Sequence, residues 1–176
     1  VFMDEGSKWP DEVVYALGTT QRHHVQLSVM ADNKANMLIG ATFVVFTLAI
    51  GQSHAGDMSL PLLILAISAF GSAGLAALAV MPSVTPRKDA SPNMLFFGGF
   101  SKISEDEFID HLLKTELRTQ ESTYRAMLRD IYQMGQILEH KKYRFLGWAY
   151  RVFLIGLTLT FITYVYEQFA GPIFQG

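Results

Sequence analysis

Three stretches of the chain are almost free of charged residues and alternate with polar segments. They cover residues 35–52, 60–81 and 148–166, and Arg151 is the only charged residue in them. Each is close to the roughly 20 residues that an α-helix needs to cross a bilayer. A single such stretch could form a buried core helix, but three of them in a chain of 176 residues favour a membrane protein.

The lysines and arginines are distributed unevenly around these stretches. Three of the 14 precede the first stretch and ten lie in residues 87–144, whereas none lies in residues 53–59 or after Arg151. Basic residues mark the cytoplasmic side of membrane proteins. The pattern therefore predicts a multi-pass protein with its N-terminus and middle segment in the cytoplasm, and with the 53–59 loop and the 167–176 tail outside.

The polar N-terminal segment, residues 1–34, predicts an amphipathic cytoplasmic helix. Pro10 suits a first helical turn, and a weakly apolar face then recurs in steps of four and three, which keeps it toward a partner helix. Nothing breaks the helix before the first apolar stretch, so we expect it to continue into the membrane. The short 53–59 loop predicts that residues 35–81 form an antiparallel transmembrane hairpin.

Small residues are concentrated in the second apolar stretch. Ala69, Ala73 and Ala77 recur every four residues beside Gly71 and Gly74. In a bilayer, small side chains let helix backbones approach closely, so we expect this face to pack on another membrane helix. The alternative is that alanine and glycine are simply common in membrane helices.

Residues 82–103 form a cytoplasmic linker in which prolines prevent a continuous helix. Its second half, NMLFFGGF at residues 93–100, gathers three phenylalanines around two glycines. We interpret this segment as a strap whose phenylalanines pack on the following helix. The alternative is a loop that touches the membrane or holds a ligand.

A cytoplasmic stalk helix is predicted for residues 104–146, and the third transmembrane helix for residues 147–166. Ser104 and Glu107 match a capping box at its start. A stripe with 4-3 spacing follows, which is typical of helix-on-helix packing. Its apolar members are Leu113, Leu117, Tyr124, Met127, Ile131, Met134, Leu138 and Phe145, and its polar members are Gln120 and Lys141. The partner could be the N-terminal helix of the same chain, the same helix of another subunit, or both.

The expected fold is therefore all-α, with three transmembrane helices and a coiled-coil-like bundle of parallel cytoplasmic helices. Because both cytoplasmic helices run toward the membrane, the linker must return along the whole stalk, whose length would be about 65 Å. A linker of about 22 residues reaches about 68 Å in a polyproline-like form. Either the linker is stretched along the stalk, or the stalk bends at residues 119–123, where helix formers are weak.

Polar and aromatic side chains come together where the cytoplasmic helices are expected to meet the membrane. Counting back from the starts of the spans gives two levels, with Asp32, Lys34, Lys142 and Arg144 at one, and Arg22, His23, Tyr132 and Gln133 at the other. Cations hold phosphates, amides bind base edges and rings stack on bases, so this cluster could bind an anionic nucleotide. Alternatively, the basic residues bind lipid headgroups and Asp32 pairs with Lys142.

Other chemistry is not indicated. The chain has no cysteine, and the adjacent His23 and His24 point to different faces of a helix, so we expect no metal site. No nucleophile–base pair, phosphate loop or paired catalytic carboxylate is recognisable, and the acidic residues at 105–107 suit the first turn of a helix. We therefore expect neither an enzyme nor a cofactor, and no nucleic-acid partner.

Several short motifs resemble the transmembrane effectors of bacterial Pycsar anti-phage defence. They are DNKAN at residues 32–36, FFG at 96–98, DIYQMG at 130–135, KYR at 142–144 and AY at 149–150. They occur in the same order and in the same three-span frame. The chain departs from the pattern in one respect, because no β-rich cyclic-nucleotide-binding domain is recognisable in it.

The resemblance implies an effector of the bacterial inner membrane that is switched on by a cyclic pyrimidine mononucleotide, cCMP or cUMP. A partner cyclase would make the nucleotide during infection, and the effector would damage the membrane and cause growth arrest or cell death. We expect it to act as a homo-oligomer. The alternative is a membrane-anchored coiled-coil scaffold that recruits a soluble nucleotide-metabolising enzyme.

The resemblance also marks positions of interest for ligand binding. Together with Arg22 and Arg144, which lie at the two levels described above, the candidate ligand-binding set is Arg22, Asp32, Lys34, Asn36, Asp130, Tyr132, Lys142, Tyr143 and Arg144.

Overall fold

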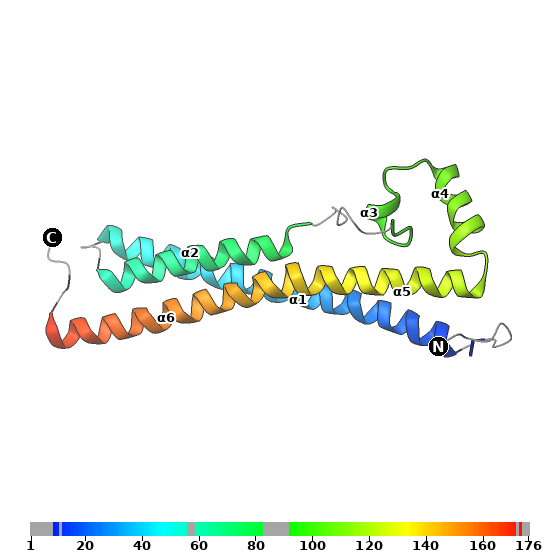
Figure 1. Ribbon diagram of the computed structural model, residues 1–176. Helices are drawn as coiled ribbons and strands as arrows, with labels where there is room; N and C mark the ends of the chain where they lie inside the picture. Colours follow the sequence, from blue (N-terminus) through cyan, green and yellow to red (C-terminus); the bar gives the residue numbers. More distant parts are fainter. Residues whose placement is uncertain (1–8, 11, 56–58, 83–91, 172, 174–176) are drawn as a thin grey trace. The chain divides into compact units, whose positions relative to one another are not determined.

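The computed structural model describes residues 9–10, 12–55, 59–82, 92–171 and 173, and every regular element within them is helical. Figure 1 shows the helices in chain order. They are α1 (Glu12–Ala55), α2 (Leu60–Val80), α3 (Phe97–Phe100), α4 (Glu105–His111), η1 (Leu112–Glu116), α5 (Gln120–Ile137), η2 (Leu138–Tyr143) and α6 (Arg144–Ala170), where η marks a π-helical segment. The prediction of an all-α chain is confirmed.

Three helical stretches are long and apolar enough to cross a membrane, namely Glu12–Gln52, Leu60–Val80 and Gln120–Ala170. They contain the three predicted apolar stretches. The polar N-terminal segment continues without a break into the first of them, as expected, because α1 is one helix of 44 residues. At this length α1 measures about 66 Å, roughly twice the hydrocarbon thickness of a bilayer. Part of α1 therefore lies outside any membrane that it crosses.

The chain folds into two compact units, each built from segments that are distant in the sequence. Unit 1 contains Val1–Leu27 and Pro82–Leu138, and unit 2 contains Ser28–Met81 and Glu139–Gly176. α1 contributes residues to both units. Unit 2 holds the apolar stretches, and unit 1 holds the polar helices and the described part of the linker.

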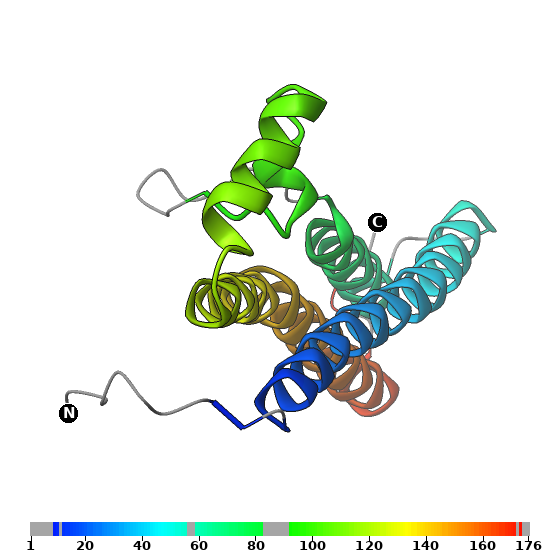
Figure 2. The same ribbon diagram turned by 90° about the vertical axis from the view of Figure 1, so that its right-hand side faces the viewer.

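Unit 2 is held together by small side chains. Its core lies where α1, α2 and α6 meet, and it consists of Ala31, Ala35, Leu38, Ala76, Ala79, Leu146 and Ala149. Figure 2, which looks roughly along these helices, shows the three next to one another. Large apolar side chains point outward instead, and Phe43, Phe70 and Phe161 are 66%, 69% and 68% exposed. Small residues at helix contacts with large ones on the surface are typical of helices that face lipid.

α2 packs against α6 through its smallest residues. The Ser72 hydroxyl donates a hydrogen bond of 2.8 Å to the Ala149 carbonyl oxygen, and Ser68 lies so close to Gly156 that an added Cβ would clash. Packing through small residues is thus confirmed, but the predicted face is partly wrong because Ala77 is exposed. The buried residues of α2 are Pro61, Ala66, Ala69, Ser72, Ala76 and Ala79. Since small residues occupy several faces of α2, their spacing could not identify the buried one.

Unit 1 pairs the beginning of α1 with α5. The Trp9 ring, just before α1, lies edge-on to the buried Tyr124 ring, with 5.4 Å between centroids. Further along, the Gln21 amide donates a hydrogen bond of 2.8 Å to Asp130. Because residue numbers rise together in the two pairs, the two segments run in the same direction.

The predicted stalk, residues 104–146, is bent rather than continuous. η1 widens the helix after α4, and the chain leaves helical geometry at residues 117–119. α5 then begins after Thr119, which forms a reciprocal capping box with Ser122. Figure 1 shows α4 turned away from the line of α5. Of the two alternatives the structure has the bend, at the beginning of the predicted region 119–123, because the capping box satisfies the free amides of a new helix start.

The predicted stripe starts before this bend and continues after it. Leu113 and Leu117 precede the bend and are 63% and 45% exposed, whereas Tyr124 and Leu138 follow it and are buried. The half-buried members are Met127, Ile131, Met134 and Phe145. A continuous stripe from Leu113 is therefore wrong, because 4-3 spacing describes one face only along an unbroken helix.

Residues 92–100 of the linker pack on α5 and α4. Asn93 is 5% exposed, and its amide donates a hydrogen bond of 2.9 Å to Asp130 of α5. The Phe100 ring packs on Phe108 of α4 with 4.7 Å between centroids. The strap interpretation expected all three phenylalanines to pack on the following helix, and the structure shows this for Phe100, whereas Phe97 is 55% exposed and its ring contacts Phe96. The buried Asn93 is an anchor that sequence reasoning missed. Residues 83–91 of the linker lie outside the described residues.

Two helix ends differ from expectation, whereas the start of α4 agrees with it. α1 continues to Ala55 and α6 to Ala170, so the 53–59 loop and the 167–176 tail are shorter than predicted. The predicted cap at Ser104 is present, because its hydroxyl accepts a hydrogen bond of 3.2 Å from the Glu107 amide.

Candidate functional site

A π-helical segment, η2, joins α5 to α6, and its sequence LEHKKY is mostly polar. A π-helix has wider turns than an α-helix, is rare in proteins and frequently occurs at functional sites. Lys142 in η2 faces α1, whereas neighbouring side chains of η2 border a hollow. The segment therefore belongs to two polar surfaces at once.

The first of these surfaces contains an ion pair between Lys142 of η2 and Asp32 of α1. The Lys142 ammonium donates hydrogen bonds of 2.8 and 2.6 Å to Asp32 Oδ1 and Oδ2, and one of 2.7 Å to the Ser28 hydroxyl. The two charged side chains are 18% and 36% exposed, so solvent and salt screen the pair less than they screen a fully exposed one. The pairing that sequence reasoning gave as an alternative to nucleotide binding is thus formed.

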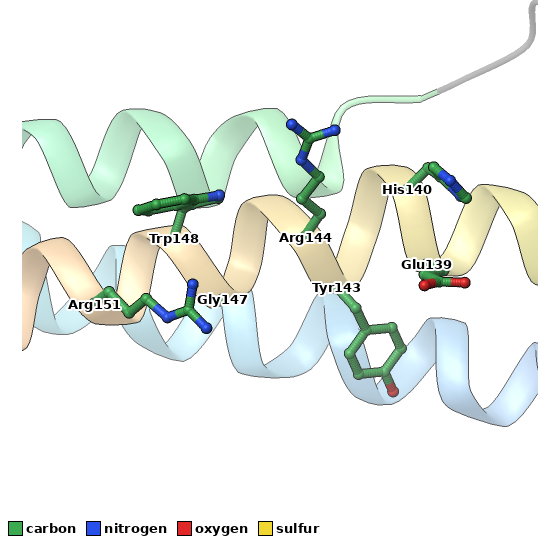
Figure 3. A pocket seen from close by; sticks show the side chains of 7 residues that line it. All are labelled: Glu139, His140, Tyr143, Arg144, Gly147, Trp148 and Arg151. Carbon is green, nitrogen blue, oxygen red and sulfur yellow. The ribbon is translucent and has the colours of Figure 1, made fainter.

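The second surface is the hollow beside η2, with a volume of about 460 Å³. Its lining residues, all from η2 and α6, are Glu139, His140, Tyr143, Arg144, Gly147, Trp148 and Arg151. Figure 3 shows their side chains along this helical run. Within the described part of the chain, no heavy atom of a neighbour lies within 4 Å of a Cβ added to Gly147. The missing side chain of Gly147 therefore keeps the middle of the hollow open.

The hollow combines cations and rings in a way that suits an anionic ligand. The Arg151 guanidinium lies 5.2 Å from the Trp148 ring centroid, within cation–π distance. Arg144 lies two turns earlier and forms no ion pair within the described residues. Guanidinium groups bind phosphate through paired hydrogen bonds, and an exposed aromatic ring offers a surface for a stacked base.

Two of the nine predicted ligand-binding residues, Tyr143 and Arg144, line this hollow. Lys34 and Asn36 lie on α1 and are exposed. The Tyr150 hydroxyl donates a hydrogen bond of 3.5 Å to the Lys34 carbonyl oxygen, so the backbone rather than the ammonium of that lysine contacts α6.

Three more of the predicted residues belong to unit 1. Arg22 and Tyr132 are exposed there. Asp130 accepts hydrogen bonds from Gln21 at Oδ2 and from Asn93 at Oδ1, at 2.8 and 2.9 Å. Asp130 therefore links α1 and the strap to α5, and each of its two oxygens accepts one hydrogen bond within unit 1.

Arg129, next to Asp130, makes a second link in unit 1. Its Nη1 donates hydrogen bonds of 2.8 Å to Glu116 at the end of η1 and of 3.3 Å to the Pro92 carbonyl oxygen. Glu116 is 7% exposed, so its carboxylate depends on this partner. The adjacent residues 129 and 130 thus attach α1, the strap and η1 to α5.

Sequence reasoning missed five lining residues of the hollow, namely Glu139, His140, Gly147, Trp148 and Arg151. The sequence does contain one indication of this site, because basic residues at 140, 144 and 151 recur at helical spacing where polar sequence changes to apolar sequence. The π-helical turn was not available, because it depends on a backbone hydrogen-bond register that side-chain periodicity does not encode.

The fold and the hollow define a helical membrane protein whose third apolar helix begins with a basic, aromatic surface. Within the described residues, no three histidine, aspartate or glutamate side chains gather closely enough to hold a metal ion. The sequence model of the Pycsar effector protein domain matches residues 15–166, and the chain belongs to this family. Comparisons with curated proteins and with solved structures gave no match.

Family membership confirms the resemblance and gives the coarse function. The protein is an anti-phage effector linked to cyclic-nucleotide signalling, functionally connected to a cyclase and associated with a membrane. The matched region runs from α1 to α6, so it contains the strap, the ion pair and the hollow.

Proposed function

We propose that the protein is an effector of the bacterial inner membrane that binds a cyclic pyrimidine mononucleotide, cCMP or cUMP, and then makes the membrane leaky. The observation that carries the proposal is the family match, because one matched region covers both the membrane-capable helices and the hollow. The sensor and the output then share one helix, α6, and no further domain is required to couple them.

The hollow supplies groups that such a nucleotide needs. Arg144 and Arg151 are the candidates for the cyclic phosphate, and Trp148 is the candidate for stacking on the pyrimidine ring. Glu139 can accept a hydrogen bond from the amino group of cytosine, whereas O4 of uracil needs a donor such as His140. Because the hollow offers both groups, parallel titrations with cCMP and cUMP would show which of the two nucleotides it binds more tightly.

The nucleotide would act on the membrane helix through η2. A π-helical turn contains about one residue more than an α-helical turn, so its conversion to an α-helix turns the following helix by roughly 100°. Leu146 and Ala149 of α6 lie in the core of unit 2 and belong to the same helical stretch as the residues that line the hollow. A ligand that binds one form of η2 more tightly would therefore change the packing of α6 on α1 and α2.

The proposal includes a topology and an assembly. The distribution of basic residues supports a topology with the N-terminus and the 82–146 segment in the cytoplasm and the C-terminus outside. A homo-oligomer would cover apolar side chains that a single chain leaves exposed in unit 1, among them Leu113, Leu117 and Leu128. Parallel helices from several chains would then form the coiled-coil-like bundle. This mechanism uses no catalytic step and no cofactor.

Proteoliposomes with an entrapped dye test the proposal. The purified protein is reconstituted, and cCMP, cUMP or cAMP is added at rising concentration. We expect dye release with a cyclic pyrimidine nucleotide and little with cAMP, and we expect calorimetry in detergent to give the same order of affinities. Intact liposomes with both pyrimidine nucleotides at every protein density would contradict the proposal.

A membrane-anchored scaffold is the alternative function, because the same exposed apolar residues of unit 1 could bind a soluble enzyme. Co-expression with an active cyclase separates the two. An effector stops growth of the host, whereas a scaffold is harmless and co-purifies with a soluble nucleotide-metabolising enzyme.

A further inference from the structure

The face of α6 that packs on α2 carries polar groups along its length. Four residues at intervals of seven, four and seven positions share this face, and they are Ala149, Gly156, Thr160 and Glu167. Ala149 and Gly156 meet Ser72 and Ser68 of α2, respectively. α2 and α6 therefore run antiparallel, and hydroxyl groups lie at their contact.

Thr160 differs from other threonines of the apolar helices. The hydroxyls of Thr42, Thr47, Thr158 and Thr163 each donate a hydrogen bond of 2.7–2.9 Å to the carbonyl oxygen four residues earlier. The Thr160 hydroxyl is buried and has no partner among the described residues. A threonine in a membrane helix normally satisfies its hydroxyl on its own backbone, so the Thr160 oxygen is available to another ligand.

Glu167 repeats this feature two turns further along the same face. Its Oε1 atom is buried and likewise has no hydrogen-bond partner in the described part of the chain. It is also the only acidic residue of α6. A buried carboxylate oxygen without a donor is costly, and such atoms are normally satisfied by water or by a cation.

Ser72, Ser68, Thr160 and Glu167 together form what we call the polar track, which follows the α2–α6 contact through the apolar part of unit 2. Ser72 meets the Ala149 carbonyl oxygen and Ser68 lies against Gly156, so neither serine faces a large side chain at these contacts. If α2 and α6 move apart along the track, the hydroxyl groups at their contact become accessible to water.

We infer that the polar track is the path along which water and cations cross the membrane when the effector is active. Hydroxyl and carboxylate oxygens replace the hydration shell of hard cations, and acidic side chains select cations in channels. The close Ser68–Gly156 contact shuts the path until α6 moves on α2. The inference rests on the proposed function, because it assigns the route of the leak.

Ion selectivity in planar bilayers tests the track. The full chain is reconstituted across a KCl gradient, cCMP or cUMP is added, and the reversal potential and conductance are measured. We expect a cation-selective current, a reversal potential that moves to zero in Glu167→Gln, and reversed selectivity in Glu167→Lys. Thr160→Val should lower the conductance several-fold, whereas Thr160→Ser should retain it.

Thr158→Val is the matched control, because Thr158 lies on the same helix but is exposed and bonded to its own backbone. It should behave like the wild type. Unchanged nucleotide affinity in detergent shows that a variant is folded. A nucleotide-dependent current that is unselective, or unaffected by the Glu167 and Thr160 substitutions, overturns the track but leaves the proposed function standing. The absence of any nucleotide-dependent current overturns both.

Discussion

Lys142 and Asp32 are joined through both carboxylate oxygens, at 2.8 and 2.6 Å, although they lie 110 residues apart in the sequence. The Ser28 hydroxyl adds a third hydrogen bond to the same ammonium group. The pair ties η2 to α1 immediately before α6 begins. It therefore holds the segment that, in the proposed mechanism, passes the signal to the membrane helix.

Replacing Lys142 should destabilise the protein measurably. We expect Lys142→Met to cost about 1–3 kcal/mol of unfolding free energy, because Asp32 loses its cation at a partly buried contact. Denaturant unfolding in detergent measures this. The control is Lys114→Met, which removes an ion pair of 2.6 Å whose side chains are 71% and 61% exposed. Its cost should stay below about 0.5 kcal/mol, and equal costs would show that partial burial adds nothing.

Two substitutions in the hollow should weaken nucleotide binding in different ways. Arg144→Gln should lower the affinity about 10- to 100-fold, because a charged hydrogen bond to phosphate is worth about 1.5–3 kcal/mol. Gly147→Leu should fill the hollow and abolish binding while leaving the unfolding temperature unchanged, since its Cβ meets open space. Calorimetry measures both, with Arg118→Gln at the bend as the control. Wild-type affinity in both hollow variants would place the nucleotide elsewhere.

Removing the Asp130 carboxylate should release the strap. Asp130→Ala leaves the buried Asn93 amide without an acceptor, which costs about 1–3 kcal/mol. Hydrogen exchange of residues 92–100 should accelerate, because the strap opens locally more often. Asp110→Ala is the control, because its side chain is 61% exposed and pairs only with Lys114 one turn away. Unchanged exchange at the strap would mean that Asp130 does not hold it.

Two glycine substitutions should have effects of opposite sign. Gly99→Ala should cost about 2 kcal/mol or more, because its Cβ would lie 1.9 Å from the Asn93 carbonyl oxygen, which is backbone and cannot rotate away. Gly18→Ala on α1 meets open space and should stabilise the protein by about 0.5–1 kcal/mol, because alanine is the better helix former. Thermal unfolding distinguishes them. An unchanged unfolding temperature in Gly99→Ala would contradict the close contact between Gly99 and the Asn93 backbone.

The long helices of this protein could be predicted because their signals are local. Continuous apolar length identifies the membrane-capable stretches, and Ser104 marks the start of α4 through a contact only three residues away. The bend before α5 could be predicted from a different argument, because a linker of limited length had to reach the far end of the stalk. In each case a property that can be counted along the sequence was sufficient to predict the structure.

The candidate site was less predictable because its parts meet only in three dimensions. Asp130 was expected to bind ligand, but its oxygens are taken by Gln21 and Asn93, which lie 109 and 37 residues away in the sequence. The π-helical register of η2 has no residue signature, so the position of Tyr143 and Arg144 with Glu139 around one hollow could not be foreseen.

The alanine-rich core of unit 2 reverses the usual relation between residue size and mutational constraint. Ala35, Ala76 and Ala149 are 0% exposed and any larger side chain there would push helices apart, whereas exposed Phe70 and Phe161 can be exchanged for other apolar residues. Alanine scanning would therefore be blind to this core, since it leaves the decisive positions unchanged. A leucine scan would detect them, and it is the appropriate screen for loss of assembly in this family.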